Sequence, residues 1–420
     1  MHMGCHGVKI LLLGSLCLAL VGCSTTFPTT LLPPPLPVAR EPTGVEATLF
    51  PLPVVGTDPN SGNDYGFLPV WVFPRGDRGI GMILAPSIID NDYAGTSLAF
   101  RLLAYPSKDV HWRVIAAPST KISSFFEVTY EKAADQAQEW FYGAQATYDA
   151  DIFPRFYGFG NDSLSSNQTN YTSRTRMLAL AVGYRVSQSW ELAWYERLTT
   201  TVLSDNHLPN LRTTASVFPA VMANRRDTAS VHGLSCSYDT RDYKETPTCG
   251  MLARFYAETA LSLLGSDSSF DKVGFEVRGF QPWDLVTKRI ITAVRLQGDF
   301  MTREYRTPFY RWPTLGGFRT NRGWGEWRWI DRNMVTLSLE QRFTVFQMHR
   351  FGVTTNFEVA PFADVGKVFP TFGKFNFRQL HAAAGIALRA VVRPQVVGHI
   401  EVGIGQGGNN SVFMGLGYPF

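Results

Sequence analysis

Hydrophobic and polar residues alternate in the segment 334–343. Its apolar residues, such as Val335 and Leu337, fall on one face, and its polar residues, including Glu340 and Arg342, fall on the other. This is the period of a β-strand with one apolar and one polar face. In a soluble sandwich the apolar face would point into a core, whereas in a membrane barrel it would point to lipid. The strand alone does not decide between these folds.

The same alternation recurs along most of the chain after about residue 79, and no convincing amphipathic helix interrupts it. In the segment 396–405, for example, Ile400 and Val402 oppose His399 and Glu401. The second face is repeatedly polar or very small, as in the lining of a water-filled lumen. This recurrence favours a membrane barrel over a soluble sandwich.

The alternating segments, counted backwards from the C-terminus, predict sixteen strands, an even number as in single-chain bacterial barrels. They lie near 79–88, 95–105, 109–118, 122–133, 138–150, 172–186, 189–200, 228–240, 250–262, 269–284, 288–300, 333–346, 352–368, 379–392, 396–405 and 411–420. The sequence therefore predicts an all-β fold, a sixteen-stranded antiparallel transmembrane β-barrel.

Composition supports the barrel. The chain of 420 residues has 13% aromatic residues, 37 glycines and only 18% charged residues, whereas soluble domains have about a quarter charged residues. The formal net charge of +4 is small, and no basic cluster with interleaved aromatics indicates a nucleic-acid partner. We therefore expect no nucleic acid to bind.

The N-terminus has the pattern of a secretory signal. A short apolar run from Ile10 to Val21 is too short to span a membrane as a helix. It ends in Leu-Val-Gly-Cys, which resembles a lipobox and predicts a signal peptide at 1–22 and lipidation of Cys23. An ordinary secretory signal with an incidental cysteine is the alternative. The proline-rich stretch 23–63 predicts a periplasmic linker, which leaves 64–420 for the barrel.

A glycine- and arginine-rich loop precedes the strand at 333–346. It contains Leu-Gly-Gly, a short spacer, Arg-Gly and an aromatic, and the strand after it contains Glu-x-Arg. This order resembles the inward-folded sixth extracellular loop of BamA/TamA-like outer-membrane proteins, the bacterial surface antigen superfamily. The segments 156–162 and 238–242 are similar to loops of family members that lack POTRA domains. The resemblance implies a barrel of the outer-membrane assembly-factor type.

The resemblance also implies roles for the loop. Gly316, Gly317, Arg322, Gly323 and Trp324 would form a plug inside the lumen. The family's loop arginine pairs with an aspartate on the thirteenth strand, and the loop itself falls between the eleventh and twelfth.

Asp364 matches that aspartate, and alternation turns it inward. An Arg322–Asp364 pair would be charge-assisted and bidentate. Arg319 competes for the same partner, and a solvated arginine beside an unrelated carboxylate is the other alternative. Glu340 and Arg342, both inward, are expected to form a ladder with Arg295 or Glu358 on neighbouring strands.

The last strand is similar to the C-terminal assembly signal of outer-membrane barrels. Tyr418 and Phe420 fall on one face of the segment 411–420 and end it with an aromatic. Pro419 and the nearby glycines weaken strand pairing, so we expect a loose closure against the first strand. In the resembled family this seam is the lateral gate.

Cys236 and Cys249 flank a predicted hairpin turn at nearly equal distances. A cross-strand disulfide in the oxidising periplasm and two separate thiols are both compatible with this spacing, because sequence does not test Cβ geometry.

By resemblance, the expected activity is insertion or translocation of protein or lipid at the outer membrane, through the loop-plugged lumen or the lateral seam. The alternative is a passive pore or scaffold. We find no catalytic constellation and no metal-binding spacing of histidines or cysteines, so we expect no enzyme and no cofactor. The family's POTRA domains have no room in the linker. The expected partners are outer-membrane lipid and an unfolded outer-membrane protein or lipid client. The expected form is a monomeric barrel in a Gram-negative outer membrane, anchored by lipid as well.

Overall fold

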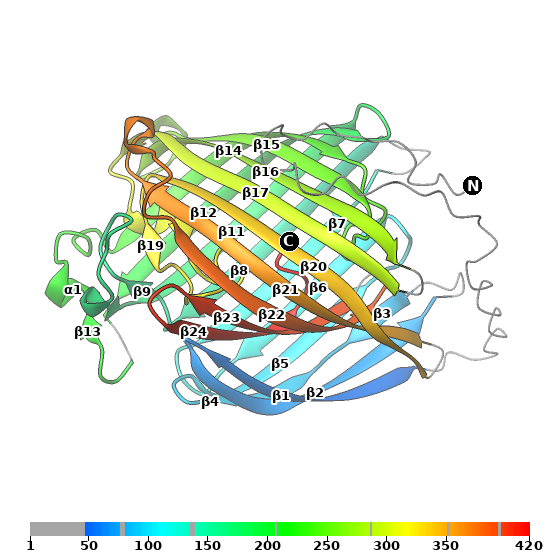
Figure 1. Ribbon diagram of the computed structural model, residues 1–420. Coiled ribbons are helices and arrows are strands. Elements are labelled where there is room, and N and C mark those ends of the chain that lie inside the picture. Colours follow the sequence, from blue (N-terminus) through cyan, green and yellow to red (C-terminus); the bar gives the residue numbers. More distant parts are fainter. Residues whose placement is uncertain are drawn as a thin grey trace. The chain divides into compact units, whose positions relative to one another are not determined.

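The computed structural model describes residues 47–75, 80–134, 139–205, 208–285, 288–350, 353–393 and 396–420. They belong to one compact unit, Glu46–Phe420. One antiparallel sheet of nineteen strand segments dominates it, and its tilted strands surround a lumen (Figure 1). Among the described residues, no helix has the length and apolar character needed to cross a membrane.

The first half of the sheet consists of consecutive antiparallel pairs. Its strands are β1 (Thr48–Asp58), β2 (Gly62–Pro74), β3 (Ile80–Leu84), β4 (Ser87–Asn91), β5 (Gly95–Ala104), β6 (Val110–Pro118), β7 (Ser124–Lys132), β8 (Trp140–Asp151), β11 (Thr172–Arg185) and β12 (Trp190–Ser204). β3 and β4 both lie between β2 and β5. They are two parts of one strand, interrupted beside Pro86, which has no backbone N–H for a ladder.

The second half continues in chain order. Its strands are β14 (Arg226–Asp239), β15 (Gly250–Ala260), β16 (Ser269–Leu285), β17 (Lys288–Tyr305), β20 (Asn333–Arg350), β21 (Val353–Phe369), β22 (His381–Val392), β23 (Val396–Gly405) and β24 (Asn409–Leu416). The predicted all-β, antiparallel fold is confirmed.

The loops at the two ends of the barrel differ in length. The long loops gather at one end, on the left of Figure 1, and hold the short elements β9 (Arg155–Phe156), β10 (Thr169–Asn170), β13 (Arg212–Thr213), α1 (Thr214–Val217), β18 (Thr314–Leu315) and β19 (Trp329–Ile330). Outer-membrane barrels have long extracellular loops and short periplasmic turns. The long-loop end is therefore the extracellular end.

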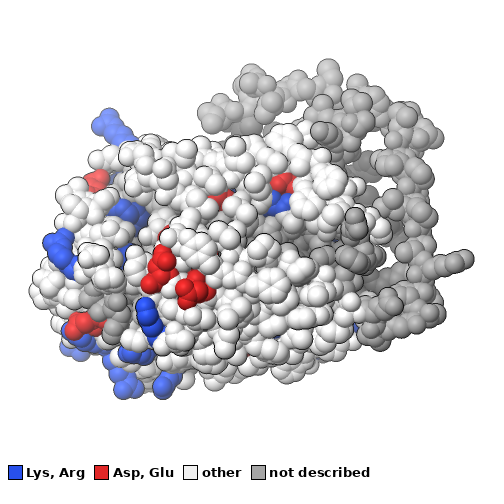
Figure 2. Space-filling model, turned by 90° about the horizontal axis from the view of Figure 1, so that it is seen from below, with Lys and Arg blue, Asp and Glu red and all other residues white. Residues whose placement is uncertain are grey.

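The strand wall has an apolar outer face and a polar inner face. On β20, Leu337 and Leu339 are 41% and 46% exposed, whereas Thr336 and Glu340 are 1% and 0% exposed. The face drawn in Figure 2 is largely free of charged residues along the wall, and many of those it shows lie toward the end that carries the long loops. This arrangement is that of a barrel in lipid, so the predicted orientation of the apolar face is confirmed.

The barrel begins earlier than the sequence predicted. Part of the predicted linker 23–63 forms β1, which pairs with β2 from Thr48 to Asp58. Pro51 and Pro53 remove ladder donors, and an edge strand tolerates this loss. The predicted count of sixteen strands is therefore not confirmed, because a hairpin precedes the first of them. The predicted signal peptide and Cys23 lie outside the described residues.

β1 and β24 lie side by side at the seam. A Cβ built on Gly56 of β1 lies 3.8 Å from the Cβ of Met414 on β24. Within the described part of the chain, no backbone ladder joins these two strands. The expected loose closure is thus present at the first and last strands of the barrel.

The chain turns into the lumen after β24. Gly417 has a φ of +96°, and beyond it Tyr418 and Phe420 are buried. The Tyr418 hydroxyl donates to Glu358 Oε2 at 2.7 Å, and Phe420 packs in a buried apolar cluster with Phe280. The predicted strand at 411–420 is therefore too long: β24 ends at Leu416, because the left-handed turn at Gly417 breaks the alternation. A role for these two residues as an assembly signal stays a prediction.

Of the two alternatives left open for Cys236 and Cys249, the disulfide between them is not formed. Cys236 is a free thiol, and its register partner on β15 is Phe255. Six residues of strand separate Phe255 from Cys249, which is about 20 Å at 3.3 Å per residue. A disulfide needs Cα atoms within about 7 Å.

We expect Gly417→Val to release the C-terminal residues from the lumen. A β-branched residue at this φ is strained by roughly 1–2 kcal/mol, and the tail would relieve the strain by leaving. A carboxypeptidase should then trim the variant faster than the unmodified protein in detergent. Gly398→Ala is the control, since Gly398 pairs with Leu416 and has open space for a Cβ. Equal trimming rates for both variants would contradict the predicted role of the turn.

Candidate functional site

The loop between β17 and β20, residues 306–332, folds into the lumen and is called the plug here. β18 and β19 pair antiparallel and form its stalk. Beyond the stalk, the tip turns back on itself, and the amide of Gly317 donates to the carbonyls of Asn321 at 3.1 Å and Trp324 at 3.0 Å. The tip therefore has a defined backbone shape.

Glycine is required where the tip turns and where it meets the wall. Gly317 has a φ of +96°, and a Cβ there would lie 2.1 Å from the Glu326 carboxylate. A Cβ on Gly323 would lie 2.6 Å from the Cβ of Ala383 on β22. Burial raises the pKa of Glu326 to about 7, although the Phe318 N–H, which donates to it, lowers the pKa. The two Cβ distances leave no room for a side chain at Gly317 or Gly323.

Arg322 reaches from the tip to the barrel wall and binds Asp364 of β21 in a bidentate way. Its Nε donates to Oδ2 and its Nη2 to Oδ1, both at 2.8 Å, and its backbone N–H donates to Oδ2 at 3.0 Å. The guanidinium also lies 3.6 Å from the centre of the Phe362 ring. The predicted partner is therefore the one that the structure brings to Arg322.

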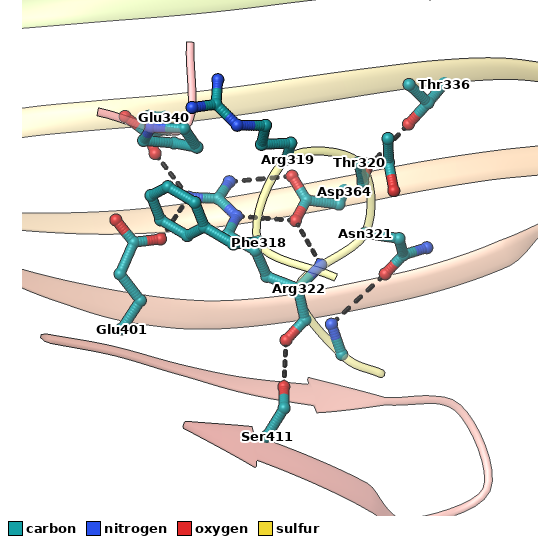
Figure 3. A network of polar contacts seen from close by, with 12 residues as sticks. Phe318, Arg319, Thr320, Asn321, Arg322, Thr336, Glu340, Asp364, Glu401 and Ser411 are labelled. Atoms are coloured by element: carbon teal, nitrogen blue, oxygen red, sulfur yellow. Dashed lines mark hydrogen bonds and ion pairs between the residues drawn. The ribbon is translucent and has the colours of Figure 1, made fainter. Parts of the chain in front are cut away.

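Two further carboxylates, Glu340 and Glu401, contact Arg322 (Figure 3), and two further arginines bind these carboxylates. Arg322 Nη1 donates to Glu340 at 2.5 Å and to Glu401 at 2.9 Å. Arg389 of β22 bridges the same two carboxylates, and Arg342 Nε donates to Glu340 at 2.9 Å. We call these six residues, Arg322, Arg342, Arg389, Glu340, Asp364 and Glu401, the plug network.

The plug network is buried and balanced in charge. Its three arginines and three carboxylates are each at most 3% exposed. Each carboxylate accepts at least three hydrogen bonds. Burying an ion costs several kcal/mol unless close partners compensate it. Removing any one member would therefore leave another buried ion with fewer partners, at a cost in stability.

The plug also contacts the last two strands. The Ser411 hydroxyl of β24 donates to the Arg322 carbonyl, and a Cβ on Gly403 of β23 would lie 2.0 Å from that carbonyl oxygen. The buried Trp324 indole packs against Gly405 of β23. The plug tip thus lies beside β23 and β24, the last two strands before the seam.

A second loop, which contains Gly160 and Ser163, contacts the base of the plug at the extracellular end. The Gly160 amide donates to the Ile330 carbonyl at 2.9 Å, and Arg328 donates to the Ser163 hydroxyl at 3.0 Å. The Asn161 side chain accepts from the Val368 amide of β21 at 3.2 Å. The segment 156–162, which carries part of the family resemblance, therefore links the plug to the wall.

Two contacts that the sequence predicted are absent. The Arg319 side chain is exposed, so Arg322 alone takes the Asp364 site. Glu340 does not contact Arg295 or Glu358, which pair instead with Glu276 and Arg393.

Sequence reasoning missed Arg389 and Ser411 and assigned no role to Glu401. Alternation had already placed Glu401 on a polar face. The run of small inward residues on β22 ending in Arg389 was a usable signal for a cation beside the plug.

We expect Arg322→Ala to destabilise the barrel by about 3–5 kcal/mol, because it leaves buried carboxylates without their partner. The plug should become accessible to a protease added from the extracellular side. Unfolding in lipid vesicles measures the first effect, and cleavage within residues 306–332 measures the second. Arg319→Ala is the matched control, three residues away on the same tip, with an expected change within about 0.5 kcal/mol. Equal behaviour of the two variants would refute the anchoring role.

Comparisons with known proteins agree with this geometry. Residues 119–392 match the Omp85 superfamily domain. No curated protein matches the chain in sequence. Among solved structures, BamA from Haemophilus ducreyi lacking POTRA domains 1–3 is similar, with a TM-score of 0.53 and 14% identity, over 88% of this chain and 74% of that chain.

Two solved structures of CdiB also match. CdiB from Acinetobacter baumannii has a TM-score of 0.46 and 11% identity, over 89% of this chain and 65% of that chain. CdiB from Escherichia coli has a TM-score of 0.46 and 14% identity, over 90% of this chain and 68% of that chain. The expected family resemblance is confirmed, and with it a β-barrel of the Gram-negative outer membrane. Since the domain match extends over more than half of the sequence, this chain belongs to the Omp85 superfamily.

Proposed function

We propose that this barrel inserts or translocates a protein or lipid client at the outer membrane, without covalent chemistry, by moving the plug and opening the seam. The observation that supports the proposal most is the contact of the plug with β23 and β24. The Arg322 guanidinium binds Glu401 of β23 and the Arg322 carbonyl accepts from Ser411 of β24. A displacement of the last strands would therefore strain the anchor of the plug.

The seam is where the wall is weakest. Every other neighbouring pair of strands is joined by a backbone ladder, as in β23–β24. Between β24 and β1 the described residues show side-by-side packing without a ladder. Opening there breaks fewer hydrogen bonds than opening elsewhere. The exposed edges could then pair with a strand of an unfolded client, which is how extended segments bind sheet edges.

The C-terminal tail joins the seam to the plug network from the inside. Arg342 donates to Glu340 and also to the Phe420 carbonyl oxygen at 3.3 Å. Its guanidinium lies 3.9 Å from the centre of the Tyr418 ring. Tail, plug and last strands therefore share one set of buried contacts, and a client entering the lumen would compete with them.

The proposal includes a lipid tether at Cys23 and a monomeric barrel. The lipobox-like sequence supports the tether. The lipid would hold the N-terminus at a membrane, since each buried CH₂ contributes about 0.8 kcal/mol of membrane affinity. Mass spectrometry of the mature chain, with Cys23→Ser for comparison, tests the modification.

A passive, plugged scaffold is the second candidate. The balanced and buried plug network favours it, because a permanent stopper needs this same anchor. The effect on client folding in vesicles separates the two candidates, and conductance across lipid bilayers distinguishes an open pore from a closed scaffold. Steady conductance, or none, together with no effect on client folding would identify the pore or scaffold.

We expect a disulfide across the seam to abolish client insertion. In a Cys236→Ser background, Gly56→Cys with Met414→Cys would place two Cβ atoms about 3.8 Å apart, the usual disulfide spacing. The folding rate of an unfolded outer-membrane protein into vesicles that hold the oxidised barrel should fall to that of empty vesicles. Reduction should restore it.

The matched control is Val402→Cys with Val412→Cys, which joins register partners of the existing β23–β24 ladder. Oxidation of this pair should leave the insertion rate unchanged. An oxidised seam that still inserts clients at full rate would rule out the seam route.

A further inference from the structure

The outer wall carries three arginines at the extracellular ends of β11 and β14, the two strands that flank β12. Arg174 and Arg176 lie on β11, and Arg226 begins β14. They continue the outward face of their strands, since Leu178 and Leu180 follow on the same face of β11 and are 49% and 46% exposed. We call Arg174, Arg176 and Arg226 the outer arginine cluster.

The strand register brings the cluster together. Arg174 is the register partner of Val202 on β12, and Val202 is the partner of Arg226 on β14. Strands lie about 4.8 Å apart, so the Cα atoms of Arg174 and Arg226 are roughly 10 Å apart. Arg176 follows two residues along β11, about 7 Å away. Arginine side chains are long enough to converge on one anion from these positions.

No carboxylate of the described residues pairs with the outer arginine cluster. Arg174 contacts only the Ser204 hydroxyl, at 3.5 Å, and the Arg176 guanidinium lies 6.0 Å from the Tyr148 ring centre. Arg176 and Arg226 are exposed. The cluster is thus a local excess of positive charge.

The nearby acidic groups are engaged elsewhere. Asp205 pairs with Arg225 at 3.1 Å, and Asp267 accepts from the Thr228 amide at 2.7 Å. Glu196 accepts from the Ser230 hydroxyl at 2.5 Å and pairs with His232. None of them neutralises the cluster in the described structure.

The position of the cluster identifies its partner. Directly below it, on the same outer faces, lie exposed apolar residues such as Leu178 on β11 and Leu198 on β12, which face acyl chains. The cluster therefore lies at the level where headgroups replace hydrocarbon. Arginine forks bind phosphate oxygens bidentately. We propose that the outer arginine cluster binds the phosphate of an anionic membrane lipid in the extracellular leaflet.

Lipid binding by the full-length chain in mixed micelles tests the proposal. The probes are phosphatidylglycerol, phosphatidylcholine and inorganic phosphate, and native mass spectrometry measures how much lipid stays bound. Arg176→Gln with Arg226→Gln should weaken phosphatidylglycerol binding about tenfold or more, given roughly 1 kcal/mol per basic residue at a membrane surface. Phosphatidylcholine binding should be the same for both proteins.

The matched control is Arg225→Gln with Arg303→Gln. It removes the same charge from exposed arginines that already have partners, Asp205 at 3.1 Å and Asp271 at 2.8 Å. Its phosphatidylglycerol binding should stay within about twofold of the unmodified protein. Heat-dependent gel mobility checks that all variants are folded. Equal losses in both variants would overturn the assignment, and so would displacement of the lipid by inorganic phosphate at equal concentration.

Discussion

The structure depends on a desolvated ion cluster in the barrel interior. A wall whose apolar side faces lipid must turn its polar side inward, and on β20–β23 that side carries Glu340, Arg342, Asp364, Arg389 and Glu401. Without the plug, Arg342 and Arg389 would face three carboxylates. Arg322 brings the missing positive charge, so the wall is electrostatically complete only when the plug is in place. The same requirement explains why the loop stays in a lumen that water would otherwise fill.

Arginine suits this position better than lysine. The planar guanidinium of Arg322 gives two parallel hydrogen bonds to Asp364 and still has Nη1 for Glu340 and Glu401. Its flat face stacks on Phe362. A lysine ammonium is a point charge with three donors and has no flat face for this stacking. One side chain thus links the loop to three strands, and its backbone carbonyl adds a fourth through Ser411.

Much of this arrangement was predictable from sequence, because period-two alternation fixes which side chains point inward. Alternation alone places Asp364, Glu340 and Glu401 on inner faces, and the glycines mark the turns of the plug. Alternation does not tell how deep in the lumen each inward side chain lies. It therefore assigned Glu340 to Arg295 or Glu358 and missed Arg389. It also missed β1, since Pro51 and Pro53 hide the pattern of an edge strand. Tyr418 and Phe420 were misplaced because one left-handed glycine, Gly417, ends the regular geometry on which the pattern rests.

The barrel places the same residue type in two opposite electrostatic settings. Inside, Arg322 and Arg389 are buried, and each is neutralised by carboxylates on several strands, which fixes their geometry. Outside, Arg176 and Arg226 are exposed and have no carboxylate partner in the described structure. A buried unpaired cation would be too costly to keep, whereas an exposed one at the membrane surface costs little and stays available for an anion. Paired arginines therefore hold the chain together, and unpaired arginines at the rim are free to contact what surrounds it.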